Sequence, residues 1–446
     1  MSRRLITLIV FIEGFSSLGA EILALRRLLP HVGSAIVVTA PTIALFLLAL
    51  ALGYAAGGRV AGEFRPRVGR NFLAAGLLAG IGLSAPAVDA LFASLPTGVA
   101  YLAFVGGVLC PIAWLLGQTV PILTNLVAAQ RTGEASGLAL YWSTLGSFLG
   151  ALGLSLGVMQ WLGVSAAVIL VAATLLAALP LLAERPGRTA LLAAGALLPV
   201  FAVNLPSTAT FDTAYAEYRV EPVARDGYQA PRAFWINKSL ASLTDDSTPP
   251  RTTRYIAHLR AILRDELAFR GRDILVLGAG GFTLAQDDPD NRYTYVDIDP
   301  AIRAIAETHF LRRPAAGEFV VDDARRYVST SERRFDAVVV DVFSSHTAIP
   351  GHLVSREFWE STRRVLKPDG VLLANVILDG KLETPYARNL LATVEAVFGR
   401  CAVEVLHKGK PLANVELSCF ASSRPGPASV YIDEKNRVDL DRAATQ

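Results

Sequence analysis

Long apolar segments recur through the first 206 residues, and they constrain the fold more than any other feature of this chain. Six runs each provide the roughly 20 residues that a helix needs to cross a bilayer core, at about 5–25, 34–57, 71–94, 98–127, 138–160 and 161–183. A seventh run, 189–203, is shorter, and we expect it to span or to lie at the interface. The first run contains Glu13 and Glu21 and is too long and too mixed for a cleaved signal peptide. We therefore expect a multispanning α-helical membrane domain over residues 1–206.

Arginines mark one side of the predicted bundle. They precede the first span and fill the second, fourth and sixth connections, whereas the third and fifth connections contain no Arg or Lys. The arginines concerned are Arg3, Arg4, Arg59, Arg65, Arg67, Arg70, Arg131, Arg185 and Arg188. Because basic residues are enriched in cytoplasmic connections, we expect the N-terminus in the cytoplasm. Only Arg26 and Arg27 go against this pattern.

Several residues inside the spans suggest more than anchoring. Charged groups are costly in hydrocarbon, so Glu13 and Glu21 are candidates for function, although Glu21 can equally pair with Arg26 or Arg27 near the helix end. Prolines at 111 and 121 predict a kinked or broken fourth span, which a packed bundle tolerates. The small residues of segment 147–153 predict close helix packing.

Charge separates the two halves of the chain. Residues 1–206 carry 11 Arg, 6 acids and no Lys, whereas residues 207–446 carry 31 basic and 33 acidic side chains. Because no basic stripe exists, nucleic acid is not an expected partner. Cys110, Cys401 and Cys419 are too few and too scattered for a disulfide framework or a metal site, and we interpret them as buried thiols.

The second half alternates strands and helices. Residues 207–252 predict a small β subdomain, with strands at 216–222, 233–237 and 240–244 and a hairpin turn at Asp226-Gly227. Residues 253–424 begin with a helix to about 266 and then predict an α/β Rossmann-like doubly wound sheet. Its expected strands are 273–277, 293–297, 318–321, 335–341, 368–376, 402–407 and 414–421, the last two forming an antiparallel hairpin edge. Its expected helices are 300–309, 323–329, 354–365 and 384–398, and residues 425–446 read as a loosely ordered tail.

A glycine-rich turn follows the first strand of this sheet. Gly278, Gly280 and Gly281 lie between strand 273–277 and a predicted short helix, and Asp297 ends the next strand. Glycines let the backbone approach a ligand, and an acid at the second strand end can accept both hydroxyls of a ribose. The stretch therefore predicts a nucleoside site.

Further acids follow the next two strands. Asp322 and Asp323 come after the third strand, and Asp341 ends the fourth. We interpret Asp322 as a helix cap. Ligands of such sheets bind at the carboxyl ends of the strands, so Asp341 is our candidate for a general base that deprotonates an attacking amine. His346, in the loop that follows, is an alternative base or an exposed loop residue, and no metal site is expected.

These motifs, taken in order, resemble the spermidine synthase (polyamine aminopropyltransferase) family over about residues 211–421, and the whole chain resembles its bacterial membrane-fused branch. The matching segments are Leu277–Gly281, Val296–Asp299, Val321–Ala324, Phe335–Asp341, Ile349–Phe358 and Leu366–Leu372. The resemblance implies transfer of an aminopropyl group from decarboxylated S-adenosylmethionine, as a co-substrate without a tightly bound cofactor, to putrescine or a related amine.

The resemblance also assigns residues. It implies that Asp297 binds the ribose hydroxyls, Asp323 the adenine, and that Asp341 deprotonates the amine. Two family acids that serve the amine are replaced here by Gly281 and Ser344. Near the gate segment of the family, Tyr255 and His258 remain, and with Ser344 and His346 they are our candidates for substrate contacts.

Three hypotheses remain open at this stage. The first is a membrane-bound aminopropyltransferase, the second an S-adenosylmethionine-dependent methyltransferase-like enzyme, and the third a non-catalytic protein that transports or senses polyamines. All three predict a multi-pass protein of the cell inner membrane, and the family resemblance allows a homo-oligomer. Six spans place residues 207–446 in the cytoplasm and seven place them outside; the expected nucleoside ligand favours the cytoplasm.

Overall fold

The chain folds into two compact units. The computed structural model describes residues 2–33, 36–127, 132–205, 209–342, 349–406, 412–423, 431–433, 438 and 441. A helical unit comprises Met1–Thr208 and Asp212–Ala214, and an α/β unit comprises Ala209–Phe211 and Tyr215–Gln446.

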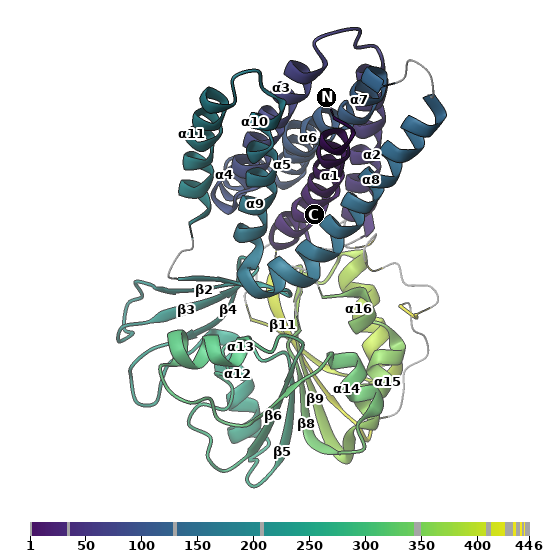
Figure 1. Ribbon diagram of the computed structural model, residues 1–446. Helices are drawn as coiled ribbons and strands as arrows, with labels where there is room; N and C mark the ends of the chain where they lie inside the picture. The colour runs from purple at the N-terminus through teal and green to yellow at the C-terminus, as the bar shows by residue number, and fades with distance from the viewer. Residues whose placement is uncertain are drawn as a thin grey trace. The chain divides into compact units, whose positions relative to one another are not determined.

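The helical unit is built from long apolar helices (Figure 1). In the described part of the chain, five helices are long and apolar enough to cross a membrane, or six when a bent pair is counted as one span. The helical elements are α1 (Arg3–Val32), α2 (Ile36–Gly58), α3 (Phe64–Leu77), η1 (Leu78–Gly82), α4 (Ala85–Ser94), α5 (Thr97–Phe104), η2 (Val105–Leu109), α6 (Cys110–Gly117), α7 (Thr119–Val127), α8 (Thr132–Leu152), η3 (Gly153–Val158), α9 (Met159–Ala177), α10 (Leu179–Leu182) and α11 (Pro186–Asn204). The prediction of several long apolar helices in this half of the chain is confirmed, and these helices are candidate membrane spans.

Breaks occur where proline or glycine interrupts the backbone ladder. The helix over Thr97–Asn125 contains the π-helical turn η2 just before Pro111 and ends its α6 segment four residues before Pro121, which confirms the predicted interruption. The third span is bent by 68° between Phe64–Gly82 and Ala85–Ser94. Within the continuous run Ser136–Leu182, Gly163 has a non-helical backbone (φ 83°, ψ 171°). The shorter seventh run forms the 19-residue helix α11, which is itself a candidate span.

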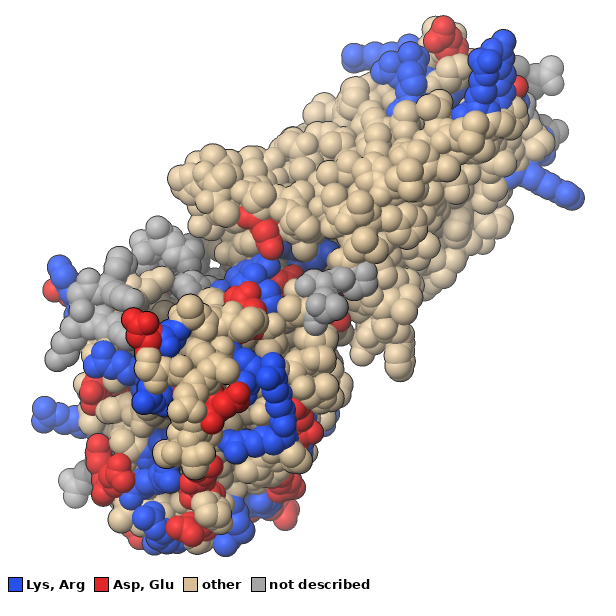
Figure 2. All heavy atoms as spheres, turned by 90° about the vertical axis from the view of Figure 1, so that its left-hand side faces the viewer, with Lys and Arg blue, Asp and Glu red and all other residues tan. Residues whose placement is uncertain are grey.

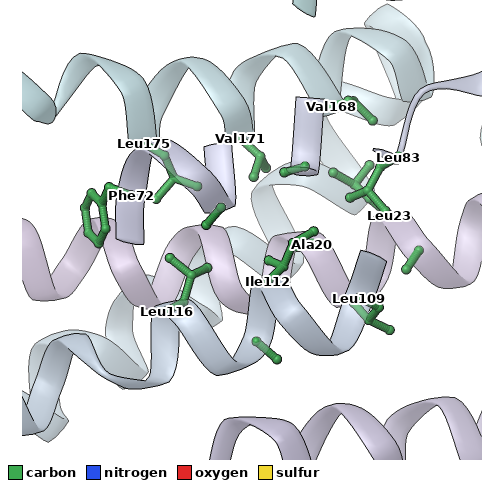
Figure 3. Packing of buried hydrophobic residues seen from close by; sticks show 14 of the residues in the cluster. Ala20, Leu23, Phe72, Leu83, Leu109, Ile112, Leu116, Val168, Val171 and Leu175 are labelled. Atoms are coloured by element: carbon green, nitrogen blue, oxygen red, sulfur yellow. The ribbon is translucent and has the colours of Figure 1, made fainter. Parts of the chain in front are cut away.

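Small residues bring α1 and α8 close together. A Cβ atom added at Gly146 would lie 2.2 Å from the carbonyl oxygen of Phe11, and one at Gly150 would lie 2.4 Å from that of Phe15. The expected close packing at segment 147–153 is therefore present at Gly150. Between the same helices, Ser143 Oγ donates a 2.7 Å hydrogen bond to the buried Glu13. Aliphatic and aromatic side chains fill the rest of this core (Figure 3).

The α/β unit begins with a four-stranded antiparallel sheet. Its strands are β1 (Thr210–Asp212), β2 (Glu217–Pro222), β3 (Arg232–Ile236) and β4 (Ser239–Thr244), in that spatial order. The connection of β2 to β3 contains the predicted turn, in which Gly227 has a φ of 78°. The predicted small β region is thus present, with one additional strand.

A seven-stranded mixed sheet forms the centre of the α/β unit. Its strand order is β10-β11-β9-β8-β5-β6-β7, with parallel pairing from β9 to β7 and antiparallel pairing at β9–β11 and β11–β10. The strands are β5 (Asp273–Leu277), β6 (Arg292–Asp297), β7 (Glu318–Val321), β8 (Phe335–Val340), β9 (Leu366–Leu378), β10 (Ala402–Val405) and β11 (Ala413–Phe420). Central parallel strands are covered on both faces, and β8 is buried along its whole length. The predicted doubly wound sheet and its antiparallel edge are confirmed.

Helices cover both faces of this sheet (Figure 1). One face packs against α14, α15 and α16, and the other against α12, the α13–η5 segment and the small sheet. The helical elements are α12 (Arg254–Ala261), η4 (Ile262–Glu266), α13 (Ile302–Ile305), η5 (Ala306–Leu311), α14 (Ala324–Thr330), η6 (Gly351–Leu353), α15 (Arg356–Arg364) and α16 (Pro385–Phe398).

Two sequence predictions are wrong. Residues 278–291 form turns rather than the short helix expected between the first two sheet strands. Cys401 and Cys419 form a disulfide bond rather than remaining buried thiols. The pairing of Ala402 with Ser418 across β10 and β11 brings the two cysteines opposite each other, so the bond follows from the register of this hairpin.

Candidate active site

The glycine turn after β5 passes directly against the end of β8. Gly278 has a φ of 88°, a region that favours glycine, and a Cβ atom there would lie 2.2 Å from the carbonyl oxygen of Asp341. Its N–H donates to the carbonyl oxygen of Val296 at 2.9 Å. Gly278 therefore permits the close approach of the strand ends that carry the site.

The next glycines close the turn against β4. The N–H of Gly281 donates to Ser242 Oγ at 3.0 Å. A Cβ atom at Gly281 would lie 2.4 Å from the Phe310 ring and 2.7 Å from Ser242 Cβ, whereas one at Gly280 would be 3.4 Å from Ser242 Oγ. An aspartate thus has no room at position 281 unless Phe310 and Ser242 move, which gives a packing reason for the absence of an acid here.

Asp297 lies at the carboxyl end of β6 and faces the glycine turn. Its Oδ2 accepts the N–H of Ala279 at 2.9 Å, and its Oδ1 accepts the N–H of Asp299 at 3.0 Å. Burial raises the pKa of this carboxyl above its ordinary value, and the backbone donors oppose that shift. The two backbone contacts fix the carboxylate beside the glycine turn, where it can accept hydrogen bonds from a ligand.

One of the two acids after β7 has a different role from the one we assigned, because Asp322 is not a helix cap. Asp323, not Asp322, is the N-cap of α14, and its Oδ1 accepts the N–H of Arg326 at 2.9 Å. Asp322 forms a 2.7 Å ion pair with Arg326 and accepts the N–H of Asp323. The second oxygen of Asp323 lies 3.7 Å from His352 Nε2. This oxygen, on a partly exposed side chain, is the one that remains available to a ligand.

Asp341 directly follows β8 and is held by two side chains. Tyr255 Oη lies 3.1 Å from its Oδ2, and Asn375 Nδ2 donates to its Oδ1 at 2.9 Å. Burial raises the pKa of Asp341 to about 6, and the hydrogen bonds from Asn375 and Tyr255 limit the rise. A carboxylate with a pKa between 5 and 7 is suited to accept a proton near neutral pH.

Helix α12 contributes two residues to this region. Tyr255 and His258 are three positions apart, so they share one face of the helix, and they contact Asp341 and Glu416 respectively. His258 Nε2 also lies 3.0 Å from Glu404. The structure thus brings both of these predicted substrate contacts to the end of the sheet.

Asn375 and Glu416 were not among the predicted site residues. Both are buried polar side chains, on β9 and β11, and the available sequence signal was the interruption of the apolar run 371–378 by Asn375. Of the predicted residues, Ser344 and His346 lie outside the described part of the chain. The others, from Gly278 to Asp341, gather at the carboxyl ends of β5, β6, β7 and β8.

Carboxylates follow three successive parallel strands beside a glycine turn, at the edge of the sheet where doubly wound α/β units bind their ligands. A family model described as "Spermine/spermidine synthase domain" matches residues 251–407. The polyamine aminopropyltransferase of Mycobacterium tuberculosis (strain H37Rv) is 28% identical over 378 residues, covering 76% of this chain and 71% of that protein. That of Vibrio vulnificus is 34% identical over 134 residues, covering 28% of this chain and only 43% of its own length.

The α/β unit of this chain is similar to the spermine/spermidine synthase domain over residues 251–407. A solved structure described as a probable spermidine synthase from Corynebacterium glutamicum is 23% identical, covers 48% of this chain and 80% of that one, and has a TM-score of 0.41. A homologue of eEF1A lysine and N-terminal methyltransferase from Drosophila pseudoobscura pseudoobscura is 29% identical over 140 residues, covering 28% of this chain and 21% of that protein.

Proposed function

We propose that this multi-pass membrane protein is a polyamine aminopropyltransferase. Its donor is decarboxylated S-adenosylmethionine, and its acceptor is putrescine or a related amine. The observation that carries the proposal is the position of Asp341. This carboxyl, with a pKa of about 6, lies between Tyr255 and Asn375 in a unit that is similar to the spermine/spermidine synthase domain.

The proposed reaction is a displacement at carbon. The lone pair of the acceptor nitrogen attacks the aminopropyl carbon bonded to the sulfonium, and a C–N bond forms as the C–S bond breaks. The bonding electrons pass to sulfur and leave methylthioadenosine as a neutral thioether, while the proton of the amine passes to Asp341. Positioning and a deprotonated nucleophile supply most of the rate enhancement in such a step.

The donor is assigned to the glycine turn. Asp297 accepts the ribose hydroxyls, and Asp323 accepts the adenine amino group through the oxygen that does not cap α14. Gly278 lets the glycine turn pass close to Asp341, so that the turn and the base lie side by side. Carboxylates beside the site also favour a sulfonium and an ammonium over neutral substrates.

Product analysis with the full-length protein in detergent tests this proposal. The protein is incubated with putrescine and either decarboxylated S-adenosylmethionine or S-adenosylmethionine, and products are identified by mass spectrometry. We expect an acceptor heavier by one aminopropyl group and equimolar methylthioadenosine with the decarboxylated donor only. Methylated product and S-adenosylhomocysteine from S-adenosylmethionine would instead establish the methyltransferase hypothesis, which the likeness to the Drosophila methyltransferase homologue supports.

The path of the helices indicates on which side of the membrane the chain leaves the helical unit. Arg27, near the end of α1, donates to the carbonyl oxygen of Leu83 and to Ser165 Oγ, and lies 3.8 Å from Asp212. Arg26 donates to the carbonyl oxygen of Thr213 at 2.9 Å. Because Asp212–Ala214 belong to the helical unit, the chain leaves this unit beside the C-terminal end of α1. With 30 residues, α1 extends about 45 Å and crosses the whole bilayer core.

The opposite end of α1 carries the basic residues. Arg3 and Arg4 begin α1, Arg59 follows α2, and three more arginines lie in the first two turns of α3. Figure 2 shows Lys and Arg gathered at one end of the helical unit, beside a broad band without charge. Basic connections face the cytoplasm, so we infer seven crossings, with the run Ser136–Leu182 divided at Gly163, and an α/β unit outside the cytoplasm.

The disulfide bond supports a location of the α/β unit outside the cytoplasm. Disulfides persist in oxidising compartments and are rare in the cytoplasm, and Cys401–Cys419 is in the α/β unit. Reporter fusions at the C-terminus of the full chain test the inference. We expect an alkaline phosphatase fusion to be active and a green fluorescent protein fusion to be dark, since each reporter works on one side only. The reverse pattern would return the α/β unit to the cytoplasm, as the six-span count predicts.

A further inference from the structure

A buried carboxylate lies beside the candidate base without being part of the proposed proton transfer. Glu416 is on β11, and its side chain is 2% exposed. Its Oε2 hydrogen-bonds to His258 Nδ1, whereas its Oε1, among the described residues, has no hydrogen-bond partner. A buried polar oxygen without a partner is costly, so this oxygen is well placed to accept a hydrogen bond from a ligand.

Strand register links Glu416 to Asp341. Glu416 pairs with Asn375 across β11 and β9, and Asn375 Nδ2 donates to Asp341 at the end of β8. Directly opposed residues of neighbouring strands point to the same face of a sheet. The three side chains therefore form one row across β11, β9 and β8, at the end of the sheet where the glycine turn lies.

Two residues of helix α12 contact the two ends of this row. Tyr255 lies against Asp341, and His258, one helical turn later, lies against Glu416. Burial raises the pKa of Glu416 to about 7; His258 opposes the rise, and the charges of Glu404 and Asp341 add to it. The charge of Asp341 thus reaches Glu416, and a cation placed between them would be favourable to both.

The distance between the two ends of the row determines the length of the ligand that can bridge them. Neighbouring strands are about 4.8 Å apart, so Glu416 and Asp341, two strands apart, are separated by roughly 10 Å. A chain of four methylenes places two nitrogens about 6 Å apart at about 1.2 Å per bond. With a charge-assisted hydrogen bond of about 2.8 Å available at each end, a diamine of this length bridges the two carboxylates.

We propose that Glu416 Oε1 binds the distal ammonium of an α,ω-diamine whose other nitrogen is at Asp341. This deepens the proposed function and rests on it. Glu416 then supplies, from β11, a negative charge for the amine in a site where Gly281 leaves no room for an acid. His258 is a positioning residue, because it holds the other oxygen of Glu416 and is itself held by Glu404.

The first experiment measures binding without chemistry. In the full-length protein without donor, 1,4-diaminobutane is expected to raise the melting temperature, and 1-aminobutane at equal concentration is not. Glu416→Gln is expected to abolish the response to the diamine. Glu360→Gln is the control, because Glu360 is a half-exposed acid on α15 that pairs with Arg356 and not with the row, and it should retain the response. Equal responses of the wild-type protein to both amines, or no response to either, would overturn the proposal.

The second experiment measures transfer to the two amines. Loss of one charge-assisted contact predicts a KM for the diamine raised by about 10- to 100-fold in Glu416→Gln, with the donor KM and transfer to 1-aminobutane unchanged. If Glu416 only tied α12 to the hairpin, both amines would be affected alike. A wild-type protein that binds the diamine but transfers nothing would contradict the proposed function and leave the amine site in place.

Discussion

Asn375 Nδ2 donates a 2.9 Å hydrogen bond to Asp341 Oδ1 across β9 and β8. This contact stabilises the ionised carboxylate and therefore lowers the pKa of Asp341, whereas burial raises it. The balance of the two effects, about 6, sets the lowest pH at which Asp341 acts as a base. Asn375 therefore extends to lower pH the range in which Asp341 is deprotonated and acts as a base.

We expect Asn375→Leu to move the acidic limb of the pH profile to higher pH. A hydrogen bond to a charged group contributes about 1.5–3 kcal/mol, which corresponds to about one to two pH units. The profile of kcat/KM against pH, compared with that of the wild-type protein, measures the shift. Asn414→Leu is the control, because Asn414 contacts Asn375 Oδ1 rather than Asp341; an equal shift in this variant would contradict the assignment.

We expect wild-type activity to decline below about pH 6. The base acts in its deprotonated form, so kcat/KM loses an additional factor of ten per pH unit once pH is below the raised pKa of Asp341. An Asp341→Asn variant should lose about 10²- to 10⁴-fold in rate and lack this break in its residual profile. A variant of near wild-type rate, in folded protein, would exclude Asp341 as the base.

Gly278→Ala should destabilise the α/β unit more than Gly271→Ala. Both glycines have positive φ, which costs an alanine on the order of 1 kcal/mol or more. Only at Gly278 does the new Cβ atom also meet backbone, the carbonyl oxygen of Asp341, because the space at Gly271 is open. The difference between the unfolding temperatures of the two variants measures the effect of this contact with backbone. Equal unfolding temperatures would show that the turn moves to accommodate the Cβ atom at Gly278.

Gly146→Leu should separate α1 from α8. The Cβ position at Gly146 lies 2.2 Å from the carbonyl oxygen of Phe11, whereas nothing lies within 4 Å of that at Gly137 on the same helix. In detergent we expect a markedly lower unfolding temperature for Gly146→Leu and little change for Gly137→Leu. Similar stability of the two variants would indicate that the close contact is not needed for the helical unit.

Local patterns predicted the elements of the sheet well. The seven strands fall within three residues of their predicted bounds, because β-branched runs bounded by turn residues are local signals. The apolar runs likewise predicted the helical unit. The helix that we predicted after β5 does not form. Its residues are buried because they lie in turns that pack against β4, and not because they share one face of a helix.

Long-range pairing explains what was missed in the site. Asn375 and Glu416 reach Asp341 only because β9 lies between β8 and β11 in register, and no local pattern specifies that order. The Cys401–Cys419 bond depends on the same kind of information, since the cysteines are 18 residues apart and meet through the β10–β11 register. The acids at strand ends were found because each lies at or within two residues of the end of its own strand.

Because of the disulfide bond, the redox state of the compartment in which the protein is produced affects its α/β unit. Glu404 and Glu416 both lie within the loop that Cys401 and Cys419 close, and in the chain-entropy account a cross-link of this length contributes about 3 kcal/mol. Protein synthesised in a reducing cytosol would hold that hairpin by hydrogen bonds alone. Preparations from an oxidising and a reducing host can therefore differ in amine affinity while having the same mass to within two hydrogens.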